Sequence, residues 1–202
     1  TVDSGTLSVA NALILDADTT GVITGTVTEG DLTTLKTLTD ENNNNALTIT
    51  VTDTSADPAD LIAVDALTSV AVNARNVETL TGSVSDLNDY RTAFEAGTIS
   101  GLSVYSVVTN DTSAAAADLL TLADTSPLDP DTNLASIGTI TGNTTQIQTL
   151  YALQSAGAQQ VSGLGNEVIV LNDTGSVAAT MLTTVAALTT DGNVSASNAI
   201  SI

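Results

Sequence analysis

The chain of 202 residues has 23 acidic and three basic residues, which gives a net charge of −20 at neutral pH. It has no His and no Cys, which excludes Ser-His and Cys-His nucleophiles and zinc sites of the ordinary kind. Nucleic acids and anionic membranes require clustered Lys and Arg, and Lys36, Arg75 and Arg91 are far apart in the sequence. We therefore expect neither partner, and we expect no enzymatic activity.

The composition also argues against an ordinary globular core. Apolar residues make up 42% of the chain, but aromatic residues only 2%. Large aromatic side chains normally fill much of a compact core. A thin core repeated between one sheet and one layer of helices needs only aliphatic residues. No apolar run approaches the ~20 residues of a membrane span.

The unit that the rest of the chain repeats is clearest between residues 47 and 67. Thr48, Thr50 and Thr52 alternate with Ile49 and Val51, which is the period of a strand with one buried face. The polar residues that follow predict a sharp corner at Asp53.

A helix is expected directly after that corner. Asp57 occupies the position of an N-cap, Pro58 follows at the first helical position, and Asp60 lies in the first turn. Apolar residues then recur at helical spacing up to Leu67. The same pattern predicts helices at 8–15, 29–38, 58–67, 84–97, 114–123, 144–157 and 177–188.

Corners of this kind recur at intervals of 22 to 31 residues and alternate between Asp and Gly, a spacing typical of solenoids. The residue two positions before the corner is mostly apolar, and the residue just before it is Thr or Asn. This regularity predicts that equivalent residues stack on neighbouring strands, about 4.8 Å apart. The expected corners are Asp3, Gly25, Asp53, Gly82, Asp111, Gly142 and Asp173.

The predicted fold is therefore an α/β solenoid over residues 1–202, with about seven strand–helix rungs. Rungs with an Asp corner alternate with rungs that have a Gly corner, a parallel sheet forms one face, and the helices form the other. Neither end carries the polar cap that a solenoid needs. We expect open strand edges there that join another copy or a longer chain, formed by Thr1, Val2, Ala199, Ile200, Ser201 and Ile202.

Calcium is the main chemical hypothesis, because Asp and Asn oxygens are its ligands. The segment 129–133 has oxygens at alternate positions, as at the start of an EF-hand loop, but it lacks the central Gly and the closing Glu. The turns at 16–21 and 40–45 are similarly rich in oxygen. The alternative is that these residues only form turns and caps, and that the corner Asp side chains accept hydrogen bonds from backbone N–H groups. The candidate calcium ligands are Asp124, Asp129, Asp131 and Asn133.

Two further patterns are less specific. Sequons for N-glycosylation begin at Asn110, Asn143, Asn172 and Asn193, and a Thr-rich chain contains such sequences by chance. The row Thr48, Thr50 and Thr52 is similar to the Thr arrays of ice-binding solenoids, but Asn and Val interrupt it on the Asp-corner rungs.

Three phrases carry a resemblance to a known class: SDLNDYRTAFEAGTISGL, VSGLGNEVIVLNDTGSVAATML and VETLTGS. They resemble the giant, acidic, Thr- and Ala-rich tandem-repeat proteins found on the surface of marine cyanobacteria and related bacteria. The resemblance covers nearly the whole chain and implies an extracellular, structural or adhesive role without catalytic residues.

Together these features predict an extracellular structural protein that forms a filament, sheath, surface layer or stalk by stacking end to end, with itself as partner. The alternative is an adhesin-type module that binds a ligand or glycan, in a calcium-dependent manner or without calcium.

Overall fold

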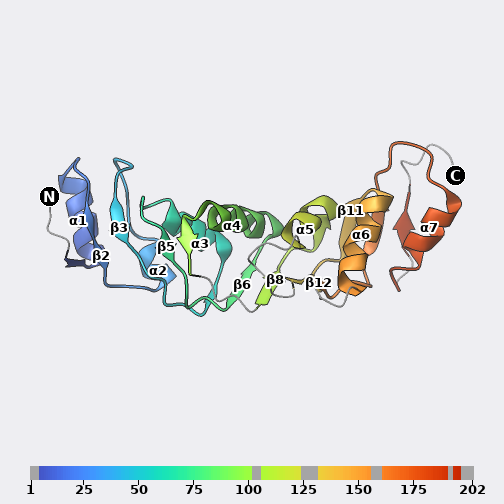
Figure 1. The fold of residues 1–202 in the computed structure, drawn as a ribbon, viewed down its shortest axis with the longest axis horizontal. Coiled ribbons are helices and arrows are strands. Elements are labelled where there is room, and N and C mark those ends of the chain that lie inside the picture. Colours follow the sequence, from blue (N-terminus) through green and yellow to red (C-terminus); the bar gives the residue numbers. More distant parts are fainter. Residues whose placement is uncertain (1–4, 102–105, 124–131, 156–160, 191–192, 197–202) are drawn as a thin grey trace. The chain divides into compact units, whose positions relative to one another are not determined.

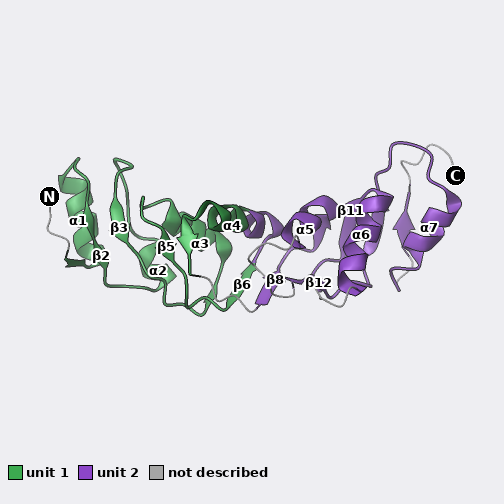
Figure 2. Ribbon diagram, viewed as in Figure 1, with its two compact units in different colours: residues 1–81, 89–105 green, residues 82–88, 106–202 purple. Residues whose placement is uncertain are grey.

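The computed structural model describes residues 5–101, 106–123, 132–155, 161–190 and 193–196. These residues form a mixed α/β fold with several parallel sheets and seven helices (Figure 1). The chain divides into two compact units. Unit 1 comprises residues 1–81 and 89–105, and unit 2 comprises residues 82–88 and 106–202 (Figure 2).

In unit 1, strands and helices alternate along the chain. The helices are α1 (Val9–Asp18), α2 (Leu32–Leu35), α3 (Pro58–Asp65) and most of α4 (Val84–Ala96). The strands are β1 (Thr6–Leu7), β2 (Thr24–Val27), β3 (Ala46–Thr48), β4 (Ser55–Ala56), β5 (Val72–Asn73), β6 (Thr79–Gly82) and β7 (Ile99–Ser100). Parallel pairing joins β1, β2 and β3, and it joins β4 to β6 and β5 to β7.

Unit 2 contains two parallel sheets. One consists of β8 (Ser106–Thr109), β10 (Thr132–Asn133) and β12 (Val161–Ser162). The other consists of β9 (Ser113–Ala115), β11 (Thr139–Gly142), β13 (Val168–Leu171) and β14 (Val194–Ser195). The helices of this unit are α5 (Ala116–Ala123), α6 (Thr144–Ser155) and α7 (Ala179–Ala186).

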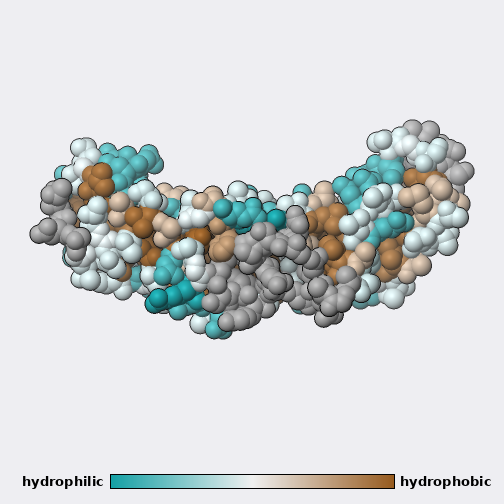
Figure 3. Space-filling view, in the orientation of Figure 1, coloured by the Kyte–Doolittle hydropathy of each residue, from teal (hydrophilic) through white to brown (hydrophobic). Residues whose placement is uncertain are grey.

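The core of each unit is mainly aliphatic, as the composition predicts, and it also contains the buried Tyr90 in unit 1 and Tyr151 in unit 2. In unit 2, Leu119, Ile140 and Ile147 come from one helix, one strand and the next helix, and each is at least 99% buried. In unit 1, Ile49 and Val51 are fully buried while Thr48 and Thr52 are exposed, so the predicted alternation is confirmed. Figure 3 shows pale, weakly polar residues over much of the visible face, which fits a surface rich in Thr, Ser, Asn and Gly.

Every predicted helix is present, although α2 has only four residues where ten were expected. The predicted start of α3 is also confirmed. The Asp57 carboxylate accepts a hydrogen bond from the N–H of Ala59 at 2.9 Å, and Pro58 is the first helical residue. Proline suits this position because it has no N–H to satisfy.

The prediction of one continuous sheet with aligned corners is wrong. Gly25 pairs with Leu47 instead of Asp53, and Gly142 pairs with Leu171 instead of Asp173. The reason is that Asp and Gly corners are built differently. After Asp53 and Asp111 a second short strand precedes the helix, whereas β11 reaches α6 directly after Gly142. A sheet can therefore pair a strand that precedes a corner with a strand that follows one, as β11 pairs with β9.

Candidate functional site

The corner carboxylates form the most regular polar feature of the structure. Asp53 accepts a hydrogen bond from the backbone N–H of Leu32 at 2.8 Å, and Asp111 accepts one from that of Val84 at 2.7 Å. Leu32 and Val84 are the first residues of α2 and α4. The prediction that corner Asp side chains bind backbone N–H groups at strand–helix junctions is thus confirmed. The helix concerned is the one that comes before the corner in the sequence.

The third corner carboxylate makes the same contact with an additional bond. Asp173 accepts from the N–H of Thr144, the first residue of α6, at 3.0 Å. It also accepts from the Thr144 hydroxyl at 3.1 Å. The first N–H groups of a helix lack partners within the helix, and the helix dipole favours negative charge there, so a carboxylate is well suited to this place.

A fourth contact of this type was not predicted. Glu29 accepts a hydrogen bond from the N–H of Val9, the first residue of α1, at 3.0 Å. Glu29 also accepts from the hydroxyl of Thr28, and the two bonds lower the pKa of its carboxyl. Sequence reasoning missed it because Glu29 lies four residues after the expected corner at Gly25. We call Glu29, Asp53, Asp111 and Asp173 the clasp carboxylates.

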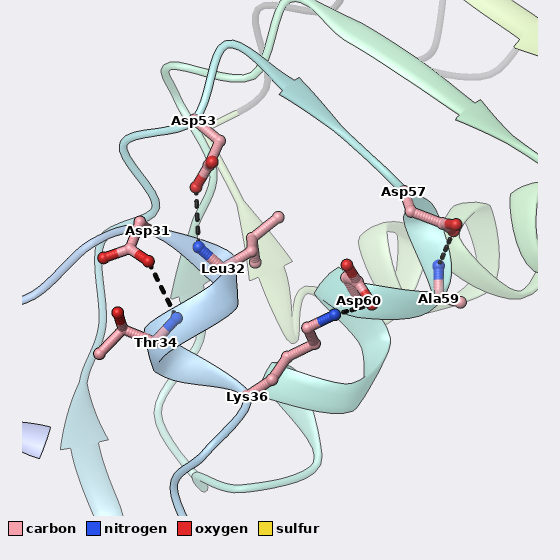
Figure 4. A network of polar contacts seen from close by, with 8 residues as sticks. All are labelled: Asp31, Leu32, Thr34, Lys36, Asp53, Asp57, Ala59 and Asp60. Atoms are coloured by element: carbon pink, nitrogen blue, oxygen red, sulfur yellow. Dashed lines mark hydrogen bonds and ion pairs between the residues drawn. The ribbon is translucent and has the colours of Figure 1, made fainter.

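The helices bound by Asp53, Asp111 and Asp173 each begin with a local cap as well. Asp31 accepts from the N–H of Thr34 at 2.9 Å (Figure 4). The side chain and then the N–H of Thr34 lower the pKa of the Asp31 carboxyl. Ser83 and Asp86 form a reciprocal pair at the start of α4. At the start of α6, Asn143 and Gln146 exchange two hydrogen bonds, as in a capping box. The clasp carboxylate therefore adds to a start that is already capped.

The glycine corner at Gly142 lies very close to the start of a helix. A Cβ atom added at Gly142 would lie 2.7 Å from the Cβ of Ala116, the first residue of α5. Only a residue without a side chain fits so close to the start of the preceding helix. This close approach accounts for the glycine at the corner of residue 142.

The VSGLGNE phrase, residues 161–167, forms a second polar site in unit 2. Glu167 is 99% buried, and its carboxylate accepts hydrogen bonds from the Tyr151 hydroxyl and from the N–H of Gly165. Burial and the neighbouring carboxylate raise the pKa of Tyr151 above its usual range. Gly163 has φ +82°, and a Cβ there would lie 2.6 Å from the N atom of Ala135. The backbone of Ala135 therefore leaves no room for a side chain at Gly163.

An open polar pocket of about 600 Å³ lies beside the Asp173 clasp. Asn143 and Asp173, two of the residues that line it, are already engaged at the start of α6. Asn172 is exposed there, whereas the amide of Asn143 is held by the capping box. The complete lining is Asn143, Thr145, Gln146, Asn172, Asp173, Thr174, Gly175 and Ser176.

Three of the four candidate calcium ligands, Asp124, Asp129 and Asp131, lie outside the described residues. Asn133 is in β10, and its side-chain oxygen accepts from the N–H of Ala135 at 2.9 Å. Within the described ranges, no three His, Cys, Asp or Glu residues are grouped as a metal site requires. The turns at 16–21 and 40–45 do come together, through the Asn42 amide on the carbonyl oxygen of Thr19 and the Asn44 amide on that of Thr20.

The six residues proposed as assembly edges also lie outside the described residues: Thr1, Val2, Ala199, Ile200, Ser201 and Ile202. The nearest described strands are β1 and β14, which pair in parallel with β2 and β13 respectively.

The structure also contains a row of Thr residues that the predicted register did not include. Thr6, Thr26 and Thr48 are paired in register on neighbouring strands, and all three are exposed.

No family model, no curated protein and no solved structure matches this chain. In the described part of the chain, no helix has both the length and the apolar character needed to cross a membrane.

Proposed function

We propose that this protein is an extracellular structural element, an α/β solenoid whose turns stack into a filament, sheath, surface layer or stalk. The observation that carries the proposal is the clasp. A carboxylate on one turn completes the helix of the turn before it, at four places in the chain. Such contacts between sequence neighbours are what a stacked array requires, because each repeat is stabilised chiefly by the next.

The strand pairing supports the same proposal. Paired residues in neighbouring parallel strands are 20 to 29 residues apart in the sequence, which is one turn of the chain. Further copies can extend such ladders through backbone hydrogen bonds and Thr columns. The acidic composition and the likeness to giant surface repeat proteins support an extracellular location.

The test is cryo-electron microscopy of the native material, without refolding or truncation. A fibre whose strands repeat about every 4.8 Å along its axis, with sheets continuous from one copy to the next, is the expected result. Discrete particles that show no end-to-end contact at any concentration would contradict the proposal.

The second candidate function is an adhesin-type module that binds glycans or other polar ligands. The pocket beside Asp173 favours it, because hydroxyl and amide groups suited to sugar hydroxyls line this pocket. Binding of oligosaccharides that is lost in Asn172→Ala, measured by calorimetry on protein of unchanged thermal stability, would favour this second function.

A further inference from the structure

Strands β1 and β14 each pair with a single neighbour among the described residues, so each has one open edge. Successive residues of a strand direct their backbone groups to opposite sides. The carbonyl oxygen of Gly5 accepts a hydrogen bond from β2 at 3.0 Å, and that of Asn193 accepts one from β13 at 2.9 Å. Thr6 therefore directs its N–H and C=O groups to the open edge of β1, and Val194 directs its own to the open edge of β14.

Neither edge has the usual protection against pairing with another strand. Natural proteins block open edges with charged residues, with proline or with a bulge. Residues 5–8 and 193–196 contain no charged residue and no proline. The short length of β1 and β14 is no obstacle to pairing, because β10 also has two residues and pairs on both of its sides.

The two edges match each other in the direction of their side chains. In a parallel ladder, a residue that bonds toward the neighbouring strand lies beside one that bonds away from it. Pairing of β14 with β1 of another copy therefore places Val194 beside Leu7. Leu7 is buried and Val194 packs against the core of unit 2, so both point inward, whereas Asn193 and Thr6 are both exposed. A mismatch by one residue would have set apolar side chains beside exposed ones.

Apolar side chains close to both edges are incompletely covered. Ile14, in the helix that follows β1, is 59% exposed, and Val22, just before β2, is 55% exposed. In unit 2, Leu182 of α7 and Val194 of β14 are only partly buried. Contact with a second copy would remove such apolar surface from water, which favours association.

We propose that β14 of one copy pairs in parallel with β1 of a second copy, with Val194 beside Leu7 and Asn193 beside Thr6. The N–H of Val194 donates to the carbonyl oxygen of Thr6 in this interface. The inference rests on the proposed function and specifies that the copies join head to tail. A two-fold contact between two β14 edges would be antiparallel, whereas every ladder in the described part of the chain is parallel.

The test uses two proline variants of the full chain, each of which blocks one edge. Thr6→Pro and Val194→Pro place a ring where an N–H faces the open edge, and they leave the hydrogen bonds to β2 and β13 in place. In sedimentation velocity at 500 mM NaCl, the unaltered chain should assemble with increasing concentration, and each variant should remain monomeric. An equimolar mixture of the two variants should form dimers and nothing larger, because only one usable pair of edges remains.

Ser113→Pro is the matched control. Ser113 lies in β9, at the opposite edge of the sheet that contains β14, and its N–H faces away from β11 because Thr112 bonds toward that strand. This variant should assemble as the unaltered chain does. Assembly of either edge variant alone, or a mixture without dimers, would overturn this interface and leave the proposed function intact. An unaltered chain that stays monomeric at every concentration would overturn both.

A pair of cysteines keeps the proposal testable if a proline variant does not fold. The chain has no cysteine, and Thr6 and Asn193 are both exposed, so Thr6→Cys/Asn193→Cys adds two surface thiols. On paired strands about 4.8 Å apart, these thiols are within reach of a disulfide. Oxidised glutathione should link this variant into a ladder on non-reducing electrophoresis, and it should leave the control Thr6→Cys/Ser113→Cys unlinked. Equal linking of both variants, or none in the first, would contradict the proposed register.

Discussion

Single carboxylates of this protein link two turns of the chain at once. Asp173 lies after β13 but binds the first residue of α6, and Asp53 likewise binds the first residue of α2. A side chain that caps its own helix contributes only to that helix. A clasp carboxylate also fixes the position of one turn against the next.

Replacing Asp173 by Ala removes the hydrogen bonds to both the N–H and the hydroxyl of Thr144. We expect the free energy of unfolding to fall by about 1–2 kcal/mol, the cost of losing a good N-terminal cap. Urea unfolding followed by circular dichroism measures this difference. Asp118→Ala is the control, because Asp118 is an exposed acid in the first turn of α5. An equal loss in both variants would show that only general charge matters.

At the scale of whole elements, helices were easier to predict than strand register. Most of the helices begin with a capping side chain and continue with apolar residues that are local in the sequence, as Asp57, Pro58 and Leu61 show for α3. Helix α7 begins after Ala178 without a side-chain cap. Register depends on contacts about 25 residues away. Nothing in the local sequence shows that Ile140 pairs with Ala114 on one side and Ile169 on the other.

The contacts of the corner carboxylates are equally hard to predict, because they too join residues that are distant in the sequence. The corner Asp residues were recognised as acceptors because Asp at a turn is a familiar signal. The donor helix was not recognised, because it lies on a different turn. No local sequence pattern marks Glu29 as an acceptor of such a hydrogen bond. A search for acids 20 to 30 residues after a helix start would have found all four clasp carboxylates.

Gly142→Ala tests the close contact between the end of β11 and the start of α5. The new methyl group would lie 2.7 Å from the Cβ of Ala116, closer than two such atoms normally approach. Overpacking of this kind costs about 1–3 kcal/mol, and the midpoint of urea unfolding should fall accordingly. Gly175→Ala provides the comparison, since no heavy atom lies within 4 Å of a Cβ there. Unchanged stability of Gly142→Ala would mean that the strand and helix can separate freely.

At the scale of the whole molecule, the net negative charge of each copy opposes the proposed stacking of copies. A net charge of −20 keeps separate copies apart in dilute salt. Lys36 forms an ion pair with Asp60 and Arg91 with Glu95, and both pairs lie within unit 1. In the proposed stack, attraction between copies would come from backbone ladders and apolar contacts, which salt does not weaken.

Salt should therefore promote assembly. Raising NaCl from 10 to 500 mM shortens the screening length from about 30 Å to below 8 Å. Sedimentation velocity should then show a larger assembled fraction. Lys36→Gln should respond as the unaltered chain does, because its ion pair is exposed and weak. Dissociation on adding salt would show instead that charge pairs hold the copies together.

Each clasp carboxylate also comes later in the chain than the helix that it binds. A polypeptide leaves the ribosome with its N-terminus first, and α1, α2, α4 and α6 each emerge before the carboxylate that completes them. Each of these helices keeps an unsatisfied N–H until 20 to 29 more residues have followed. At these four helix starts, a later segment of the chain is therefore needed to satisfy the N–H of an earlier helix.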